Sequence, residues 1–552
     1  MKTQRFLKEN LEKALIKQLI KTDIKNQKSL SKLKRKFSKQ FKTSLSSNID
    51  LLKTYHILVQ NKSIKKSVKI EKALITRPIR SLSGIVNISV LTKPAPCPGK
   101  CAFCPIEKGF PKSYLAGEPA ADRAATLNFD PYLQTQSRLK MLKDQGHPTD
   151  KIELRIIGGT WSYYSKQYQT WFITRCFEAC NAELRGSKRR TTLKKEQKKN
   201  EKVKNRIVGL SIETRPDFIT KKEIIRLRKL GVTLVEMGIQ TVFDDILKKN
   251  KTKLTTRKIA ESTKLLKNAG FKILYQIMPN LPGSTIKKDL KLFKILFNDI
   301  RFKPDWIKIY PCLICKNTQL YKWWKQGQYK PYTKKQLIKL LIEIKKTLPF
   351  WTRLTRLFRD IPAQKIIAGC KTSNLREVVY KEMKGKNIQC KCIRCREVRQ
   401  KYNSKEKPYL FREDYNASEG KEIFLSFENK KRTKLFSLLR LRIPSHHKNS
   451  SHYGFAVLQN ASIIREIQTF GQQLGIRGRI SCCACGRDPT SYAPDKYVQH
   501  KGLGRKLIKK AEEITKKEFC LNKIAVISGI GAREYYRKHG YKLKNTYMVK
   551  KL

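Results

Sequence analysis

The stretch Pro96-Cys-Pro-Gly-Lys-Cys-Ala-Phe-Cys-Pro105 places three cysteines, Cys97, Cys101 and Cys104, on one short loop with the spacing C-x3-C-x2-C. Three thiolates on one loop can hold three irons of a cubane iron–sulfur cluster and leave the fourth iron open to a small molecule. A structural cluster more often has a fourth protein ligand nearby, and a structural zinc site more often has two C-x2-C pairs. The triplet therefore favours a cluster with an open iron, and zinc is the alternative.

A pair of glycines lies at the end of the next predicted strand after the cysteine loop. In Ile156-Ile-Gly-Gly-Thr160, Gly158 and Gly159 end an apolar run with strand character. Glycines at a strand end let backbone groups approach a ligand closely, although a Gly-Gly pair alone is also an ordinary turn. The cysteine spacing resembles that of the radical S-adenosylmethionine (SAM) enzymes. That resemblance implies that the cysteine loop holds a [4Fe–4S] cluster and that the glycine pair holds the amino group of SAM.

Apolar segments with strand character alternate with helical stretches through the middle of the chain. The six predicted strands lie at 85–91, 152–157, 207–212, 233–237, 273–278 and 306–310, with helices between them at 131–143, 221–230 and 256–268 among others. This order predicts parallel βα units in a partial (βα)6 barrel with its active face at the C-terminal strand ends. The cysteine loop follows the first strand, as that face requires. Polar residues that fall at the ends of strands three and four are Glu213, Arg215, Glu236 and Gln240.

The charge of the chain points to a polyanionic partner. Its 552 residues include 121 Lys and Arg against 44 Asp and Glu, a net charge of +77. Such an excess favours nucleic acid, because neutralising phosphates releases counterions. Compositional bias toward Lys, Asn and Ile is the alternative source of the charge. With 40% hydrophobic residues the chain can bury several cores.

Targeting signals are weak. No apolar run is long enough to predict a membrane span, and residues 1–22 lack the apolar centre of a secretory signal. This basic segment has the character of an organelle transit segment, but Glu9, Glu12 and Asp23 argue against one. Fifteen cysteines without a secretory signal indicate metal sites and free thiols in a reducing compartment rather than disulfides.

Composition divides the chain into four predicted parts. Residues 1–75 form a basic segment that begins with an amphipathic helix, to be expected either of an RNA-docking element or of a packed helix. The barrel follows at 76–365, with the basic stretch 188–204 as a surface insertion. A cysteine-rich connector covers 366–410, and residues 411–552 are predicted to be a mixed α/β domain. Its expected strands lie at 422–428, 434–443, 454–457, 463–470 and 524–528, with a helix at 503–517.

A glycine-rich loop leads into that last helix. Gln499-His-Lys-Gly-Leu-Gly504 directly precedes Arg505, and such a loop presents backbone N–H groups and a positive helix end to a pyrophosphate. It lacks the Lys-Ser/Thr of a P-loop. It is similar to the coenzyme A loop of the GNAT acetyltransferases, which implies a sulfur-contacting tyrosine near the C-terminus. Tyr535 and Tyr536 are the candidates for that role, and a core tyrosine is the alternative.

The connector carries a second cysteine group. Cys390, Cys392 and Cys395 are one ligand short of a tetrahedral zinc site. Cys312 is the first choice for the fourth ligand and Cys315 the second. A further group, Cys482, Cys483 and Cys485, is interpreted as an incidental insertion rather than a metal site.

A radical SAM barrel, a cysteine connector and a GNAT domain in this order resemble the catalytic subunit of Elongator over residues 75–552. Segments that carry the resemblance are 92–94 with the cysteine triplet, 130–136, 212–217, 278–282, 359–362, 373–377, 412–415 and 523–529. The resemblance implies a tRNA-modifying acyltransferase that carboxymethylates C5 of the wobble uridine (34). In that chemistry the cluster cleaves SAM to a radical, the radical activates the methyl group of acetyl-CoA, and the uridine is flipped out of its loop.

The resemblance also implies roles for individual residues. Lys272 and Lys308, with Tyr535 and Tyr536, are the catalytic candidates, and both lysines are expected to line the barrel cavity. The implied SAM contacts are Gly158, Gly159 and Glu213. The implied acetyl-CoA contacts are Lys151, Glu466, Ile467, Gln468, Thr469, Gln499, Gly502, Leu503, Gly504, Arg505 and Tyr536.

Two features depart from the family. The cysteine triplet has a shorter first gap than animal and fungal members, and the segment 482–496 is longer than the usual link into Gln499, which affects the acetyl-CoA entrance. A protein lysine acetyltransferase that uses the GNAT domain, on histones or tubulin, is the main alternative function. A non-enzymatic RNA-binding subunit is another, and the retained coenzyme A loop argues against it.

By the same resemblance the expected partners are the tRNA anticodon loop, other Elongator subunits and a second copy in a homodimer, with no membrane. The expected location is the cytoplasm, with the nucleus as a further possibility.

Overall fold

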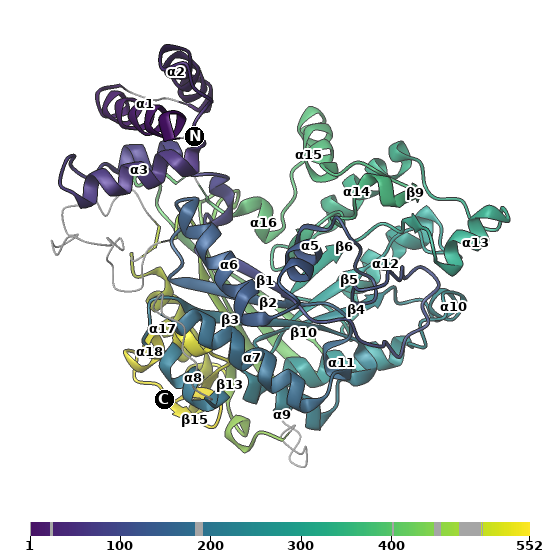
Figure 1. Cartoon of the computed structure of the whole chain (residues 1–552). Helices are drawn as coiled ribbons and strands as arrows, with labels where there is room; N and C mark the ends of the chain where they lie inside the picture. The colour runs from purple at the N-terminus through teal and green to yellow at the C-terminus, as the bar shows by residue number, and fades with distance from the viewer. Residues whose placement is uncertain are drawn as a thin grey trace.

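The computed structural model describes residues 2–22, 26–182, 191–399, 402–445, 454–473, 498–499 and 501–552. These residues form an N-terminal group of helices, a seven-stranded parallel sheet and a seven-stranded mixed sheet (Figure 1). The two large sheets lie one behind the other, and the N-terminal helices project from one side. Within this described part, no helix has the length and apolarity needed to cross a membrane.

The N-terminal helices share a small core of their own. They are α1 (Lys2–Lys21), α2 (Gln27–Gln40), α3 (Asn48–Gln60) and α4 (Val68–Leu74). Leu15 and Leu19 of α1 are buried against Leu51 and Leu52 of α3, whereas Leu7 stays exposed. The predicted amphipathic helix is therefore present, and its leucine face is covered by neighbouring helices of the same chain.

The first sheet is the predicted partial barrel with one strand more than expected. Its order is β1-β2-β3-β4-β5-β6-β8, every pair is parallel, and the two edge strands do not pair with each other. Its strands are β1 (Val86–Leu91), β2 (Lys151–Ile157), β3 (Arg206–Thr214), β4 (Leu234–Gln240), β5 (Lys272–Ile277), β6 (Trp306–Ile309) and β8 (Arg353–Arg356). The sequence pattern did not predict β8 because this strand contains a single Leu between charged and polar residues.

Helices follow the strands in the βα order. The bounds of the larger ones are α5 (Pro119–Thr126), α6 (Pro131–Asp144), α7 (Lys166–Asn181), α9 (Lys221–Leu230), α11 (Thr256–Asn268), α12 (Ile286–Asn298) and α14 (Lys334–Thr347). Local signals fix α9: the Thr220 side chain accepts a hydrogen bond from the backbone N–H of Glu223, and Gly231 ends the helix with φ +92°. Such caps explain why the predicted bounds of α9 and α11 coincide with the observed ones.

Shorter elements complete the region around the barrel. They are α10 (Asp244–Lys249), α13 (Gln319–Lys325), α15 (Leu375–Gly385), α16 (Ile393–Arg396) and the antiparallel pair of β7 (Ile314–Cys315) with β9 (Ile366–Ala368).

The second half of the basic stretch 188–204 is not a surface insertion. It forms α8 (Leu193–Asn200), which packs on α7, and the following Glu201 is buried. Glu201 pairs with Arg533 at 3.0 Å and with Arg537 at 2.7 Å, both on α18 (Arg533–Arg537) of the second domain. Figure 1 shows α8 beside α18. The prediction was wrong because the lysine-rich composition concealed one buried carboxylate whose partners lie more than 300 residues away.

The second sheet is mixed, with the order β10-β11-β12-β13-β14-β16-β15. Its elements are β10 (Tyr409–Ala417), β11 (Gly420–Glu428), β12 (Leu435–Pro444), β13 (Ser462–Thr469), β14 (Lys523–Val526), β15 (Lys542–Lys544) and β16 (Tyr547–Lys551), with α17 (Leu503–Lys517) between β13 and β14. Only the pair β13–β14 is parallel. The strand predicted at 454–457 is wrong: residues Ala456–Leu458 form a single 3-10 turn. The strands β10, β15 and β16 were not predicted.

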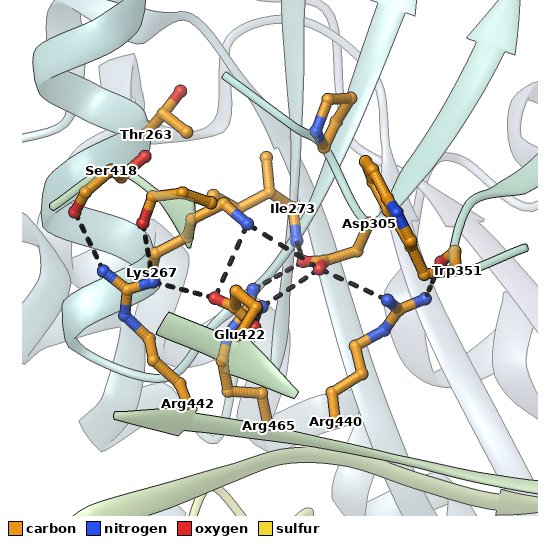
Figure 2. Close-up of polar contacts among 12 residues, drawn as sticks. Thr263, Lys267, Ile273, Asp305, Trp351, Ser418, Glu422, Arg440, Arg442 and Arg465 are labelled. Atoms are coloured by element: carbon orange, nitrogen blue, oxygen red, sulfur yellow. Dashed lines mark hydrogen bonds and ion pairs between the residues drawn. The ribbon is translucent and has the colours of Figure 1, made fainter. Parts of the chain in front are cut away.

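A buried cluster of charged side chains joins the two sheets (Figure 2). Asp305, directly before β6, accepts a hydrogen bond from Arg465 on β13 at 3.0 Å and lies 3.7 Å from Arg440 on β12. Glu422 on β11 accepts from the same Arg465 at 2.9 Å and from Arg442 at 2.8 Å. All five side chains are at most 1% exposed, so these charges are compensated by one another and by backbone groups rather than by bulk water.

A lysine from the barrel completes this cluster. Lys267 on α11 lies 3.6 Å from Glu422 and 3.9 Å from Asp305. Burial lowers its pKa to about 8, although the two carboxylates oppose that effect. Because Lys267 and Asp305 come from the barrel and Glu422 from the mixed sheet, separating the two domains would leave buried charges without partners.

Candidate functional site

An upper cavity of about 260 Å³ lies at the C-terminal ends of the barrel strands. The three cysteines of the first loop line it together with residues at the C-terminal ends of β2, β3, β4, β5, β6 and β8. Those residues include Gly158, Gly159, Glu213, Arg215, Gln240, Met278, Tyr310 and Arg356. The structure thus brings the predicted cysteine and glycine motifs to one cavity.

The cysteine loop suits a metal cluster. Cys97, Cys101 and Cys104 are free and half-buried, and the loop is fixed by a hydrogen bond from the backbone N–H of Ala102 to the carbonyl of Asn250 at 3.0 Å. Burial raises the pKa of Cys104 to about 12, so a metal must displace the proton when it binds. Cationic side chains that lie near the thiols and favour their ionised form are Arg215, Lys112 and Arg359. This donor set fits a thiolate-ligated cluster that carries negative charge.

The glycine at position 158 is required by the local geometry. Gly158 has φ +141°, and a Cβ atom there would lie 2.0 Å from the Thr92 Oγ1 atom. No side chain fits in that space, so the backbone of this turn is held close to the end of β1. The turn leaves backbone groups facing the upper cavity, as the sequence predicts for a ligand-binding loop.

Beneath the cysteines the barrel interior holds a chain of paired polar groups. Glu213 accepts hydrogen bonds from Tyr114 Oη at 2.8 Å and from Gln276 Nε2 at 3.0 Å, and it lies 3.3 Å from Lys308 Nζ. Lys308 also binds Glu236. Glu213 was predicted to lie at this strand end, but its partners Tyr114 and Gln276 were not identified from the sequence.

The buried carboxylate of Glu236 is ionised. Burial alone would raise its pKa, but Arg155, at 2.6 Å, and Lys308 hold the pKa at about 2. Arg155 was also missed from the sequence. The sequence does contain a signal for Arg155: side chains alternate between the two faces of β2, so Arg155 lies on the same face as Lys151 and Ile157, which line the two cavities.

A lower cavity of about 460 Å³ lies between the N-terminal ends of the barrel strands and the mixed sheet. It opens where β13 and β14 separate and α17 begins. All residues predicted to contact acetyl-CoA line it, namely Lys151, Glu466, Ile467, Gln468, Thr469, Gln499, Gly502, Leu503, Gly504, Arg505 and Tyr536, together with Lys272 and Tyr535. Its volume is in the range of small-molecule and cofactor sites.

Gln499 ties this cavity to both domains. Its Nε2 donates to the carbonyl of Gly84 at 3.2 Å and to that of Thr469 at 3.1 Å, and its Oε1 accepts from Lys151 Nζ at 3.0 Å. Burial lowers the pKa of Lys151 to about 8. The described end of the glycine-rich loop is therefore anchored to the barrel and not only to its own sheet.

The two candidate tyrosines differ in their surroundings. Tyr535 is 37% exposed, and a Cβ atom on Gly504 would lie 2.9 Å from its hydroxyl, so this hydroxyl closes on the start of α17. Tyr536 is buried among Leu507, Tyr541 and other core residues while still lining the cavity. Burial raises the pKa of Tyr535 to about 12.

The two candidate lysines belong to different cavities. Lys272, the first residue of β5, lies 3.5 Å from Glu466 in the lower cavity, and its Nζ is 4.8 Å from the ring centre of Trp306. Lys308 lies inside β6 and lines the upper cavity. The expectation that both line one barrel cavity is not met, because the two lysines stand at different heights on neighbouring strands.

Three connector cysteines form a compact group. The Sγ atoms of Cys390, Cys392 and Cys395 lie within 4.8 Å of one another, and in the part of the chain that the structure describes they are the one such group of potential metal ligands. Cys395 also contacts Tyr380 Oη at 2.6 Å and Lys345 Nζ at 3.5 Å.

Neither predicted fourth ligand lies in this group. Cys312 packs with Leu281, Ile314 and Leu320 in a separate cluster, and Cys315 lines the upper cavity. Sequence spacing could not reveal this because Cys315 pairs with Ile366 in the β7–β9 pair and Cys312 packs beside that pair, contacts that form only in the folded chain. The group at 482–485 lies outside the described residues.

Two family models match the chain. The model described as the Radical SAM superfamily matches residues 96–294, and the Radical SAM C-terminal domain matches residues 304–385. The first match contains the cysteine loop and the upper cavity's glycine turn.

Curated relatives match most of the chain. A tRNA uridine(34) acetyltransferase of Methanocaldococcus infernus is 45% identical over 488 residues, which cover 86% of this chain and 87% of that protein. The Elongator complex protein 3 of Bos taurus is 36% identical over 494 residues and 86% of each chain. A solved structure, the archaeal Elp3 of Methanocaldococcus infernus with an N-terminal deletion, superposes with a TM-score of 0.70 at 41% identity and covers 86% of this chain and 100% of that one.

Proposed function

We propose that this chain, which belongs to the family of the tRNA uridine(34) acetyltransferases and Elongator complex protein 3, carboxymethylates C5 of the wobble uridine of tRNA with SAM and acetyl-CoA. The observation that carries the proposal is the pairing of two cavities on one barrel. The upper one holds the cysteine triplet, and the lower one gathers the residues of the coenzyme A loop.

In the upper cavity, Cys97, Cys101 and Cys104 would hold three irons of a [4Fe–4S] cluster. When bound, the cluster and SAM supply a 5′-deoxyadenosyl radical that takes a hydrogen atom from the acetyl methyl group. The chain's own contribution is positioning: the turn at Gly158 admits the amino-acid part of SAM, and Lys308 and Glu213 fix the polar floor of the cavity.

In the lower cavity, positive groups would bind the acyl donor. The first N–H groups of α17 and the ammonium of Lys151 would bind the phosphates of acetyl-CoA, while the flexible arm of the cofactor carries the acetyl group toward the upper cavity. Tyr535, whose hydroxyl faces the start of α17, would contact the sulfur end of the cofactor. Hydrolysis of the thioester would then release coenzyme A and leave the carboxymethyl group on C5 of the base.

The remaining expectations belong to the same proposal. The net charge of +77 suits a tRNA anticodon loop as substrate, and membership of the family suits other Elongator subunits, a second copy of the chain, and a cytoplasmic or nuclear location. Cys390, Cys392 and Cys395 would bind zinc with a fourth ligand from outside the described residues or from solvent.

Lysine acetylation by the second domain is not retained as an alternative. Among described residues that line the lower cavity, Glu466 is the one carboxylate, and it is held by Arg440 at 2.7 Å and by Lys272. Burial raises the pKa of Glu466, but these cations lower it below its ordinary value. A carboxylate in this state is a weak base for deprotonating a substrate lysine.

The test is anaerobic reconstitution of the full chain with iron, sulfide, SAM, a reductant, tRNA and acetyl-CoA deuterated on its methyl group. We expect deuterium in the 5′-deoxyadenosine and a carboxymethyl group on uridine 34. Cys101→Ala should abolish SAM cleavage and leave acetyl-CoA binding intact. Acetyl-CoA turnover that ignores tRNA and acetylates lysine peptides would overturn the proposal.

A further inference from the structure

A row of aromatic rings runs from the glycine turn of the upper cavity to the protein surface. Tyr164, Tyr168 and Trp171 form this row: the first two rings stack with centroids 5.0 Å apart, and the next two lie 5.6 Å apart. Their exposure rises along the row, from the buried Tyr164 to Trp171, which is 45% exposed. We call these three residues the aromatic row.

The inner end of the row lies directly behind the glycine turn that lines the upper cavity. The hydroxyl of Tyr164 lies 2.8 Å from Thr92 Oγ1 and donates to the carbonyl of Lys93 at 2.7 Å. A Cβ atom on Gly159 would lie 3.7 Å from the same hydroxyl. The row therefore begins at the turn that the proposed function assigns to SAM.

The same loop places positive charge over the row. The backbone N–H of Lys93 donates to Tyr168 Oη at 3.0 Å, and its ammonium lies 5.0 Å from the centre of that ring. Lys93 and Lys166 are exposed, and the carboxylate of Glu178 on the same helix is paired with Arg175. The surface around the row is thus aromatic and cationic.

A single exposed apolar side chain is common, but a group of exposed aromatic rings is typical of an interaction site. The protein has only six tryptophans, and Tyr163, in the turn that leads into the row, is 46% exposed as well. Aromatic faces beside lysines are the features with which proteins bind unpaired nucleotides, since every base has a stacking face and every nucleotide a phosphate.

We propose that the aromatic row is a stacking platform for an unpaired RNA nucleotide next to the base that enters the upper cavity. The proposal rests on the proposed function for the nature of the substrate. A base stacked on Trp171 would extend the row by one ring, while Lys93 and Lys166 would face its phosphates. The stack on Trp171 and the two ring-to-ring steps of the row then separate the nucleotide from the glycine turn.

The test compares three forms of the full-length protein: wild type, Trp171→Leu and Trp171→Phe. Leucine keeps the apolar contacts of α7 but has no ring, and phenylalanine keeps a stacking face. The probes are an anticodon stem-loop RNA with an unpaired loop and a fully paired RNA duplex with the same number of nucleotides. Dissociation constants are measured without SAM or acetyl-CoA, so the result does not depend on the chemistry.

We expect Trp171→Leu to weaken binding of the stem-loop about tenfold, which corresponds to about 1.4 kcal/mol, because one base loses its stacking partner. Binding of the fully paired RNA duplex should change less than twofold, and Trp171→Phe should retain most of the affinity for the stem-loop. Equal loss on both RNAs, or no loss on the stem-loop, would overturn the proposal. So would a wild-type dimer that Trp171→Leu converts to monomers without changing RNA affinity, because the row would then be a protein interface.

These outcomes are separable from a failure of the proposed function. A wild-type protein that binds the stem-loop through Trp171 yet makes no modified uridine would refute the reaction and leave the platform standing. If the Trp171→Leu variant modifies uridine as well as the wild type and binds the stem-loop with unchanged affinity, the platform alone is refuted.

Discussion

The buried charged cluster between the two sheets makes a strong prediction about Asp305. Replacing Asp305 with Asn keeps the size of the side chain and removes its negative charge. Arg465, Arg440 and Lys267 would then lose one of their negatively charged partners, and water cannot replace it because the side chain of residue 305 is fully buried. We expect the substitution to weaken the contact between the barrel and the mixed sheet rather than either sheet alone.

The distances give the size of the effect. With an effective dielectric constant of about 20, a pair at 3.0 Å contributes roughly 5.5 kcal/mol and a pair at 3.7 Å roughly 4.5 kcal/mol. The cluster reorganises when a charge is removed, and breaking a buried pair is observed to cost about 3–5 kcal/mol. We therefore expect Asp305→Asn to lower the free energy of unfolding by about 3–5 kcal/mol.

The assay is urea unfolding, followed by tryptophan fluorescence and by far-UV circular dichroism. Loss of the contact should also separate the transition into two steps, one for each sheet. Asp245→Asn is the matched control, because Asp245 forms an ion pair with Lys288 at 2.7 Å on the exposed surface of the same barrel. That control should unfold like the wild type.

A second variant protects the reasoning from a trivial loss of folding. Asp305→Asn combined with Arg465→Met removes an anion and a cation together, so it should recover part of the lost stability. The argument is refuted if Asp305→Asn unfolds at the same urea concentration as Asp245→Asn, or if the double variant is less stable than the sum of its parts.

Three further predictions concern the cavities and the connector. Lys151 has a pKa of about 8 instead of 10.5, so its ammonium loses a proton as the pH rises from about 7 to 9, and the affinity for acetyl-CoA measured by calorimetry should fall about tenfold over that range. Lys151→Met should bind acetyl-CoA weakly at every pH, and a variant that keeps the pH profile of the wild type would contradict the assignment. Metal analysis should find zinc in the wild type and in Cys520→Ser, which changes an exposed cysteine outside the group, but not in Cys392→Ser. Gly529→Ala should cost about 1–3 kcal/mol in unfolding experiments, because its Cβ would lie 2.1 Å from a carbonyl oxygen of β3, whereas Gly385→Ala meets no atom within 4 Å and should be tolerated.

Much of the fold was predictable because its signals are local. The helices at 221–230, 256–268 and 503–517 were predicted at their observed bounds, since each has a local apolar spacing and the first two begin directly after a capping threonine. The six barrel strands were identified because parallel strands buried on both faces read as continuous apolar runs. The edge strand β10, in contrast, alternates exposed and half-buried charged residues, a pattern that resembles a loop.

The site was predictable to the extent that its residues stand in motifs. The cysteine triplet, the glycine turn and the coenzyme A loop are each contiguous, and the first two share a cavity in the structure. The partners that complete the site are not contiguous. Tyr114 meets Glu213 across 99 residues, and Lys151 meets Gln499 across 348, so only the folded chain reveals them.

The same limit explains the error about the connector cysteines. Cys312 has a suitable residue type and a suitable place in the order of the chain, but it packs in a separate apolar cluster beside the β7–β9 pair, and that packing depends on how the pair folds. Ligand sets assembled from several elements therefore remain proposals until distances are known.

The position of the two cavities at opposite ends of the same strands determines which molecules could use both. Lys151 lines the lower cavity and Ile157 the upper one, and six residues of strand span about 20 Å. A compact metabolite held at one end would never meet a reactive group held at the other. A substrate on a long flexible arm, or one that a moving carrier delivers, could cross that distance. The length of β2 thus sets the distance that a molecule must span in order to use both cavities.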